Sequence, residues 1–342
     1  MSEAYFQIDN YKLKRTGILE TGHTSTISQI SIFPSKKYYI SVSYDKSIII
    51  WNEDNSISQK INDAHEREIS YVCIKDDDNF ATSSYDDSIK FWKKDENEFK
   101  LDKTIPHAHK ESIHKILFQS NNNLISCSSD YSLKIWKLNN DNNYINIKTL
   151  YHEEEIYSFL IIEDKNLLIS SGVGDDKTIF WDLETYDKIS ELNKITSYTA
   201  NSMLRITENI IVIGEEDGYK LRFIDIDKKQ KIKQINTKFY NFGMYLLQDK
   251  GIFLVGGFNG IKIYTIDDFK KIQFVKNAEN NDINGFFEMK NNVIGTFGDN
   301  GKIQTWEFQL KNEEDDKNDD RNSDDDDEDD ENIGSSDEEN ED

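Results

Sequence analysis

The sequence predicts an all-β protein built from seven similar sheets, and two regularities lead to this prediction. First, a short hydrophobic strand ends in an aromatic or bulky residue seven times, at intervals of 40 to 45 residues. A fixed period of this length is typical of repeat architectures. Second, each copy contains short runs with the alternation of β-strands, and none with helical period. The repeated positions are Trp51, Trp92, Trp136, Trp181, Phe223 or Ile224, Tyr264 and Trp306.

The first copy shows how one unit is built. Residues 27–32 and 39–43 carry spaced apolar and β-branched side chains and are predicted to be strands. The polar turn 44–47 leads into a third strand at 48–51, and a weaker fourth run follows at 58–61. Because so small a sheet cannot shield both of its faces, each unit needs neighbours stacked on it.

Polar residues recur as regularly as the apolar ones in the first four copies. A histidine opens each copy, an aspartate stands six residues before each tryptophan, and a hydroxyl residue stands four residues before each aspartate. The four sets are His23, Ser41, Asp45 and Trp51; His65, Thr82, Asp86 and Trp92; His109, Ser126, Asp130 and Trp136; and His152, Ser171, Asp175 and Trp181.

With these motifs the chain resembles the WD-repeat β-propeller family, over roughly residues 12 to 310. The resemblance implies a seven-bladed β-propeller of four-stranded antiparallel blades. It also implies that each His, Ser/Thr, Asp and Trp set is a buried hydrogen-bonded tetrad. This assignment agrees with physical chemistry, because a buried carboxylate needs donors and an indole N–H needs an acceptor.

The pattern is weaker in the last three copies. The fifth has Asp217-Gly218 but no opening histidine. The sixth and seventh have Asn259-Gly260 and Asn300-Gly301 where the aspartate is expected, and Tyr264 replaces a tryptophan. The strand pattern persists, so seven blades are predicted.

The ends of the repeat region predict a closed ring. After Trp306 only residues 307–310 remain before the chain becomes acidic, so the last blade lacks a fourth strand. Residues 13–19 form an unassigned strand at the N-terminus. Pairing it with blade seven removes an open sheet edge. The predicted organisation is an N-terminal arm at 1–11, a propeller at 12–310 and a tail at 311–342.

The charge is concentrated in that tail. Residues 313–342 hold 19 acidic and 2 basic residues, a net charge of −17 out of −24 for the chain. Such a segment is predicted to be disordered. It is either a solubility tail or a low-affinity clamp for basic partners. Three serines have an acidic residue three positions on, the pattern of acidophilic kinase sites, and are candidate phosphorylation sites: Ser323, Ser335 and Ser336.

Catalysis, metals and membranes are not indicated. His107 and His114 lie near His109 in the sequence, but no cysteine or carboxylate completes a zinc set. No nucleophile set stands outside the repeated tetrads and no loop is suited to phosphate, so neither an enzyme nor a cofactor is expected. Cys73 and Cys127 are expected to be buried thiols in a reducing compartment. No signal peptide and no long apolar run is seen, which suggests a cytoplasmic or nuclear protein.

The resemblance also implies a partner-binding rim around the channel mouth. By register with the family its positions are Thr26, Ser28, Glu68, Ser70, Ser112, His114, Glu155, Tyr157, Thr199, Asn201, Asn241, Asp282 and Asn284, with Tyr198 and Tyr240 beside them. Blades two to four add an acidic lip: Glu66, Glu68, Glu111, Glu153, Glu154 and Glu155. These residues form either solvated loops or a groove for a basic peptide.

Several propeller roles are disfavoured. Phosphopeptide readers need several arginines on this rim, whereas only Arg67 lies there. The sequence Trp181-Asp182-Leu183-Glu184 lacks the arginine common in cullin-type ligase adaptors of the family. A net-negative chain also repels nucleic acid.

The function that we expect is therefore a non-enzymatic scaffold, a single propeller within a larger complex, with basic or lysine-rich partners. One alternative is a chaperone for histones or ribosomal proteins that uses the tail. Another rests on the long connections after Trp92 and Trp136, which are similar to those of the propeller subunit that targets cytosolic iron–sulfur clusters.

Overall fold

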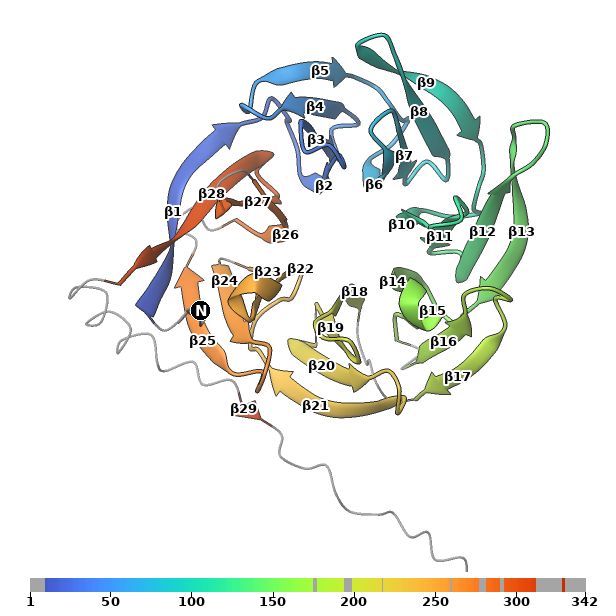
Figure 1. The fold of residues 1–342 in the computed structure, drawn as a ribbon. Helices are drawn as coiled ribbons and strands as arrows, with labels where there is room; N and C mark the ends of the chain where they lie inside the picture. Colours follow the sequence, from blue (N-terminus) through green and yellow to red (C-terminus); the bar gives the residue numbers. More distant parts are fainter. Residues whose placement is uncertain are drawn as a thin grey trace, which may run out of the picture.

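The computed structural model describes residues 10–174, 177–193, 199–216, 218–258, 260–276, 281–289, 292–311 and 328–329. Within these ranges the strands form seven antiparallel sheets arranged as a ring around an open centre (Figure 1). The innermost strand of each sheet faces the centre and the outermost faces outward. The predicted all-β, seven-bladed propeller is confirmed.

The blades follow one another along the chain. The first four are β2 (Ile27–Ile32), β3 (Tyr38–Ser43), β4 (Ile48–Asn52), β5 (Ile57–Ile61); β6 (Ile69–Asp76), β7 (Asn79–Ser84), β8 (Ile89–Asp95), β9 (Glu98–Ile105); β10 (Ile113–Phe118), β11 (Leu124–Ser128), β12 (Ser132–Leu138), β13 (Tyr144–Tyr151); and β14 (Ile156–Ile162), β15 (Leu167–Gly172), β16 (Thr178–Asp182), β17 (Lys188–Leu192).

The last three blades have the same organisation. They contain β18 (Ala200–Arg205), β19 (Ile210–Glu215), β20 (Lys220–Asp225), β21 (Gln230–Asn236); β22 (Gly243–Leu247), β23 (Ile252–Gly257), β24 (Gly260–Thr265), β25 (Lys271–Lys276); and β26 (Ile283–Glu288), β27 (Ile294–Gly298), β28 (Lys302–Leu310) with β1 (Tyr11–Glu20). Two single 3₁₀ turns, η2 (Glu163–Lys165) and η3 (Gln248–Lys250), connect inner strands in blades four and six.

The ring is closed by the N-terminal strand. Strand β1 pairs antiparallel with β28 from Tyr11 opposite Leu310 to Glu20 opposite Lys302, with one bulge between Arg15 and Gly17. The sheet order is β1-β28-β27-β26, so the first strand of the chain is the outer strand of the last blade. The predicted closure is confirmed.

The hydrophobic core of the described chain lies between blades, and each interface has the same plan. The bulky residue of each third strand packs on the blade before it: Trp92 contacts the blade-one cluster that includes Ile40 and Ile50. Across the closing seam Trp51 packs with Phe297 of blade seven. In blade five this role belongs to Ile224, which packs with blade-four residues, so Ile224 rather than Phe223 is the repeat position.

The arm and the tail lie almost entirely outside the described residues. Residues 1–9 are not described, and of the predicted disordered tail only Lys311 and the two-residue strand β29 (Glu328–Asp329) are described. Strand β29 pairs with the outer strand β21 of blade five. The disorder of the tail and the candidate sites Ser323, Ser335 and Ser336 therefore stay predictions.

The seam makes one stability prediction. Leu13 of β1 is buried against Trp306, Ile263 and Phe286. Replacing it by alanine leaves a cavity between β1 and its neighbours, so Leu13→Ala should lower the free energy of unfolding by about 2–5 kcal/mol. Thr16→Ala, at an exposed position of the same strand, should change it by less than about 0.5 kcal/mol. Urea unfolding measures both; equal losses would mean that β1 does not hold the ring closed.

Candidate functional site

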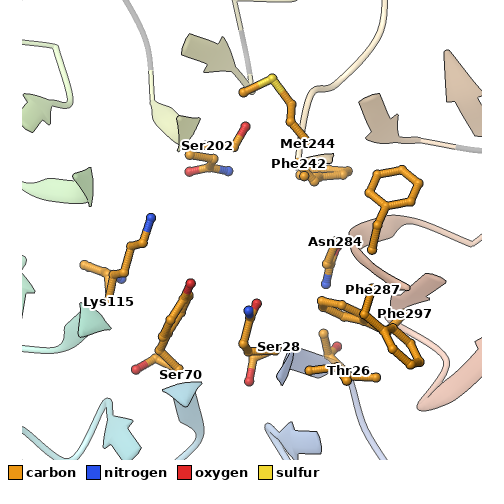
Figure 2. Close-up of a pocket in the computed structure, with 18 of the residues that line it drawn as sticks. Thr26, Ser28, Ser70, Lys115, Ser202, Phe242, Met244, Asn284, Phe287 and Phe297 are labelled. Carbon is orange, nitrogen blue, oxygen red and sulfur yellow. The ribbon is translucent and has the colours of Figure 1, made fainter. Parts of the chain in front are cut away.

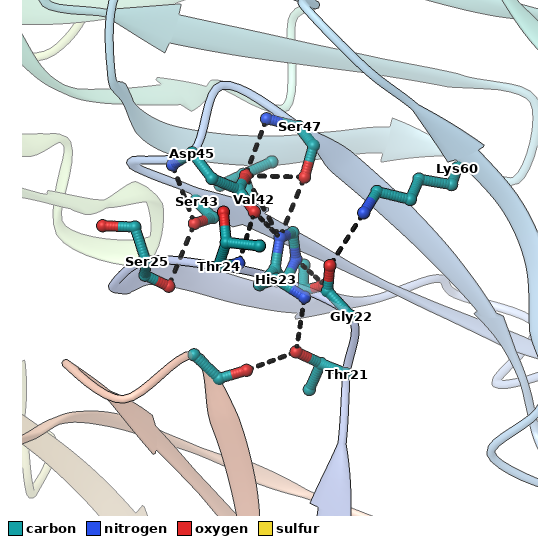
Figure 3. Close-up of polar contacts among 12 residues, drawn as sticks. Thr21, Gly22, His23, Thr24, Ser25, Val42, Ser43, Asp45, Ser47 and Lys60 are labelled. Atoms are coloured by element: carbon teal, nitrogen blue, oxygen red, sulfur yellow. Dashed lines mark hydrogen bonds and ion pairs between the residues drawn. The ribbon is translucent and has the colours of Figure 1, made fainter.

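The first blade contains a directed chain of hydrogen bonds. The indole N–H of Trp51 donates to Ser41 Oγ at 2.9 Å, and Ser41 Oγ lies 2.8 Å from His23 Nε2. On its other side His23 Nδ1 lies 3.1 Å from Asp45 Oδ2 (Figure 3). All donors and acceptors match if the imidazole is neutral and carries its proton on Nδ1. The tryptophan is thereby tied through its own blade to the turn at the channel mouth.

Blades two and three repeat this geometry. His65 lies 2.8 Å from Thr82 Oγ1 and 3.0 Å from Asp86, and Trp92 donates to Thr82 at 2.9 Å. The matching distances in blade three, among His109, Ser126, Asp130 and Trp136, are 2.7, 3.0 and 2.8 Å.

The tetrads favour a neutral histidine and an ionised aspartate. Burial lowers the pKa of the His65 and His109 imidazoles, which favours the neutral ring. Burial alone would raise the pKa of Asp86 and Asp130, but hydrogen bonds from histidine, serine and backbone N–H hold both well below the ordinary value. The hydrogen bonds of these tetrads are therefore complete at neutral pH. We call each hydrogen-bonded tetrad a lock.

In blades one to three each lock includes a second hydroxyl, from a serine that sequence reasoning missed. Ser47 Oγ donates to Asp45 Oδ1 at 2.6 Å, and Ser88 and Ser132 do the same to Asp86 and Asp130 at 2.6 and 2.5 Å. Each of these serines stands two residues after its aspartate. The recurrent Asp-x-Ser spacing is the signal that could have identified them.

Blade four corrects one predicted residue. Both His152 Nε2 and Trp181 Nε1 contact Ser170 Oγ, at 2.7 and 2.8 Å, whereas the Oγ of the predicted Ser171 donates to Lys177 O at 3.1 Å. The hydroxyl stands eleven residues before the tryptophan here and ten in blades one to three, because the intervening turn is one residue longer. Asp175 lies outside the described residues.

The last blades replace the tetrad by other polar contacts. In blade five Arg222 and Glu215 are both buried and form an ion pair at 2.8 Å, and Arg222 also donates to Gln234 at 2.6 Å. In blade seven Trp306 donates to Thr296 Oγ1 at 2.9 Å, the same ten-residue spacing as in blade one. Arg222 pairs in register with Ile213, so Glu215 reaches it diagonally, and a charged residue in each of two apolar strands was the sequence signal for the ion pair.

The channel mouth is a hollow at which all seven blades meet. A cavity of about 680 Å³ opens there and is lined from all seven blades (Figure 2). The predicted rim residues that line it are Thr26, Ser28, Ser70, His114, Tyr157, Asn201 and Asn284. The structure therefore brings together residues that are separated by more than 250 positions in the chain.

The other predicted rim residues have different surroundings. Four of them contribute backbone carbonyls, which accept hydrogen bonds from the facing turns at 2.8 to 3.0 Å and so fix the loops around the mouth. They are Glu68, Ser112, Glu155 and Thr199. Asn241 corrects the prediction, because it is fully buried and donates to Glu215 O and Lys220 O. A buried asparagine that holds two backbone carbonyls cannot contact a partner.

The remaining rim residue, Asp282, lies beside a second carboxylate. Burial first, and then a hydrogen bond shared with Asp299, raises the pKa of Asp282 to about 6. The amide of Asn284 lies 3.4 Å from the same Asp299. This pair adds negative charge to the blade-seven side of the mouth as the pH rises. Tyr198, predicted beside the rim, lies outside the described residues.

An arc of aromatic rings lines the mouth on blades one to four. The hydroxyls of Tyr44 and Tyr85 lie 2.9 Å apart, the Tyr85 ring meets His114 edge-on, and His114 stacks on Tyr157 with ring centres 3.9 Å apart. Burial lowers the pKa of His114 to about 4, so this imidazole is uncharged at neutral pH. Tyr44 and Tyr85 were missed, although each directly precedes a tetrad aspartate.

The acidic lip stands outside this arc on blades two to four. Glu66, Glu111, Glu153 and Glu154 are exposed, and Glu68 and Glu155 are half-buried at the mouth. Two of the six carboxylates have cationic neighbours: Arg67 lies 3.6 Å from Glu68, and Lys177 lies 2.5 Å from Glu153. The lip keeps a negative excess next to neutral aromatic surface.

The described ranges contain neither a candidate metal cluster nor a helix that could span a membrane. No cluster of three or more His, Cys, Asp or Glu residues suited to a metal ion occurs there. His107, one of the histidines near a tetrad, is exposed and pairs with Asp87 at 3.0 Å. Within the same ranges no helix has the length and apolarity that crossing a bilayer requires. Cys73 and Cys127 are free and buried, as expected.

Blade four allows the serine assignment to be tested. Ser170→Ala leaves His152 and Trp181 without their common partner, which should cost about 1–3 kcal/mol of unfolding free energy. The adjacent Ser171→Ala removes a part-buried hydrogen bond to Lys177 O and should cost less, about 0.5–1 kcal/mol. Chemical denaturation of the two variants compares them. A larger loss at Ser171 would restore the original assignment.

The tetrads also predict how stability depends on pH. His65, His109 and His114 have lowered pKa values in the folded chain, so the unfolded chain binds more protons below about pH 6.5. Stability should therefore be complete above that pH and fall on acidification, with a second loss below about pH 4 as the tetrad aspartates protonate. Asp282 has the opposite effect on stability. Because its pKa is raised in the folded chain, the folded chain binds more protons than the unfolded chain, and stability from this group increases as the pH falls from about 6 to 4.

Urea titrations at pH 8, 6, 5 and 4 measure this dependence. Repeating them with Asp282→Asn removes the opposing contribution and should make the first loss steeper. Stability that rises between pH 7 and 5 in that variant would contradict neutral, buried imidazoles.

Comparison with known proteins agrees with the fold and with the tetrads. The WD domain, G-beta repeat model matches residues 13–52, 57–93 and 100–137, which are the three copies with complete described tetrads. A search of curated proteins found no match. Three blades thus match the WD repeat, and the ring of seven four-stranded blades is a β-propeller that matches a WD-repeat family.

Proposed function

We propose that this propeller is a protein-interaction scaffold whose channel mouth binds a basic segment of a partner protein. WD-repeat propellers generally serve as protein–protein interaction scaffolds. The observation that supports a basic ligand is the acidic lip beside an arc of uncharged rings. Carboxylates attract lysine and arginine, and aromatic faces add cation–π attraction at short range.

The interior of the channel limits how far such a segment reaches. Lys115 faces the channel and donates to Phe159 O at 3.0 Å, and burial lowers its pKa to about 8 (Figure 2). A cationic side chain that passed the mouth would meet this amine. The partner is therefore expected to lie across the mouth rather than to thread the channel.

Charge reversal on the lip tests the proposal. The triple variant Glu66→Lys, Glu111→Lys and Glu154→Lys changes exposed side chains only. It should weaken binding of a fluorescent lysine- and arginine-rich 14-residue peptide at least tenfold, and wild-type binding should weaken as salt rises. Anisotropy titrations with the full chain measure both effects.

A control separates local attraction from net charge. Glu96 and Glu184 lie on connections between third and fourth strands and Glu98 begins β9, so all three are exposed at the opposite ends of the blades. Reversing these three makes the same change in net charge and should alter the affinity less than about twofold. Equal losses in the two triple variants would reject the lip as the site.

The acidic tail supports a second candidate function, a chaperone for basic cargo. Its net charge of −17 attracts histones or ribosomal proteins without a folded site. Deleting residues 313–342 in the same titrations distinguishes the two. Binding that survives the deletion but not lip reversal supports the scaffold, and the opposite result supports the chaperone.

The long hairpins behind the iron–sulfur likeness form a separate surface. They are the third-to-fourth strand pairs β8–β9 and β12–β13, which project outward from blades two and three (Figure 1). Their position on the outer wall gives them no share in the channel mouth, and their shape specifies no cargo.

A further inference from the structure

The face that carries the lip also exposes aromatic side chains on blades five and six. Phe258 is 51% exposed and Tyr219 is 39% exposed. The Tyr240 ring lies between them, with its centre 4.9 Å from that of Tyr219 and 6.4 Å from that of Phe258. We call Tyr219, Tyr240 and Phe258 the aromatic shelf. Exposed clustered rings of this kind are uncommon on a surface that contacts only water.

The shelf and the mouth belong to one continuous surface. Tyr219 and Phe258 lie in turns between second and third strands, as Tyr44 and Tyr85 do, so all four stand at the same end of their blades. Tyr240 stacks on Phe242 at 5.9 Å, and Phe242 lines the mouth cavity (Figure 2). One extended segment can therefore contact the shelf and the lip together.

The shelf also has a shape and a charge that differ from those of the lip. Its rings surround a hollow of about 360 Å³ whose walls include Phe239, Phe274, Lys238 and Lys276. Both lysines are exposed. An aromatic or aliphatic side chain fits such a hollow, and a neighbouring carboxylate would pair with the lysines, whereas a cationic residue would be repelled.

We propose that the channel face recognises a bipartite segment of a partner protein, with cationic residues on the acidic lip and an apolar anchor with an acidic neighbour on the aromatic shelf. This proposal rests on the proposed function and adds the chemistry of the other half of the ligand. Charge complementarity fixes the orientation, because the reverse placement sets lysines against lysines. A purely basic segment would use the lip alone and bind more weakly.

Two peptides test the proposal on the full chain. The first joins a lysine–arginine half through glycine and serine to a half that contains leucine, phenylalanine and aspartate, and it is made in both orders. The second has serine in place of the leucine and phenylalanine. The double variant Tyr219→Asn and Phe258→Ser should weaken binding of the first peptide, in its better order, at least tenfold, and of the second less than twofold. Asparagine suits the positive φ of 50° at Tyr219.

Matched controls keep the result specific. Ile145→Ser and Leu101→Ser remove apolar side chains of similar exposure from outer strands, and they should leave both affinities unchanged. Thermal unfolding confirms that each variant is folded.

The outcomes distinguish this proposal from the one on which it rests. If the shelf variant binds the first peptide as well as the wild type does, while lip reversal still abolishes binding, the bipartite ligand is wrong and the basic-segment scaffold stands. If lip reversal leaves the first peptide bound through the shelf, the two halves do not act on one segment. If neither variant changes binding, both proposals fail.

Discussion

The structure depends on one recurring contact, in which a bulky third-strand side chain is held by its own blade while it packs on the blade before it. Trp92 illustrates both sides of the contact: its indole N–H is bonded to Thr82, and its ring lies against Ile40 and Ile50 of blade one. Packing alone would allow the ring to adopt other rotamers. The hydrogen bond restricts it to the one that fills the interface, so adjacent blades keep a defined angle and the ring can close.

The later blades show that the packing is essential and the tetrad is not. Ile224 and Tyr264 occupy the interface position without a described His–Asp lock, and both are fully buried. In blade five the polar interior is instead the ion pair of Arg222 with Glu215, completed by Gln234. A buried pair of this kind gains little net stability unless its hydrogen bonds are satisfied, and here the guanidinium has partners on two strands. The same architecture is thus reached by a different polar solution.

What the sequence could predict follows from the range of each interaction. The period, the strands and the first three tetrads depend on local spacing, and ring closure follows because Leu13 and its neighbours form a strand without another partner. Ser170 was missed because a single extra turn residue shifts the hydroxyl, and no spacing rule reveals such an insertion. Asn241 was placed on the rim by register, but its amide donates to two backbone carbonyls of the blade-five turn, and register alone does not reveal such contacts. The aromatic shelf joins turns from two blades, so its adjacency exists only in the folded ring.

In blades one and two the same turn carries the aspartate of the lock and a tyrosine of the binding face. Tyr44 and Tyr85, which line the mouth, each precede an aspartate whose carboxylate accepts hydrogen bonds from histidine and serine. The turn cannot relax without breaking those bonds, so each ring is presented on a rigid support. A partner that binds there loses little affinity to ordering of the surface. The interactions that stabilise each blade therefore also preorganise the residues proposed to recognise the partner, although they contribute no contact of their own.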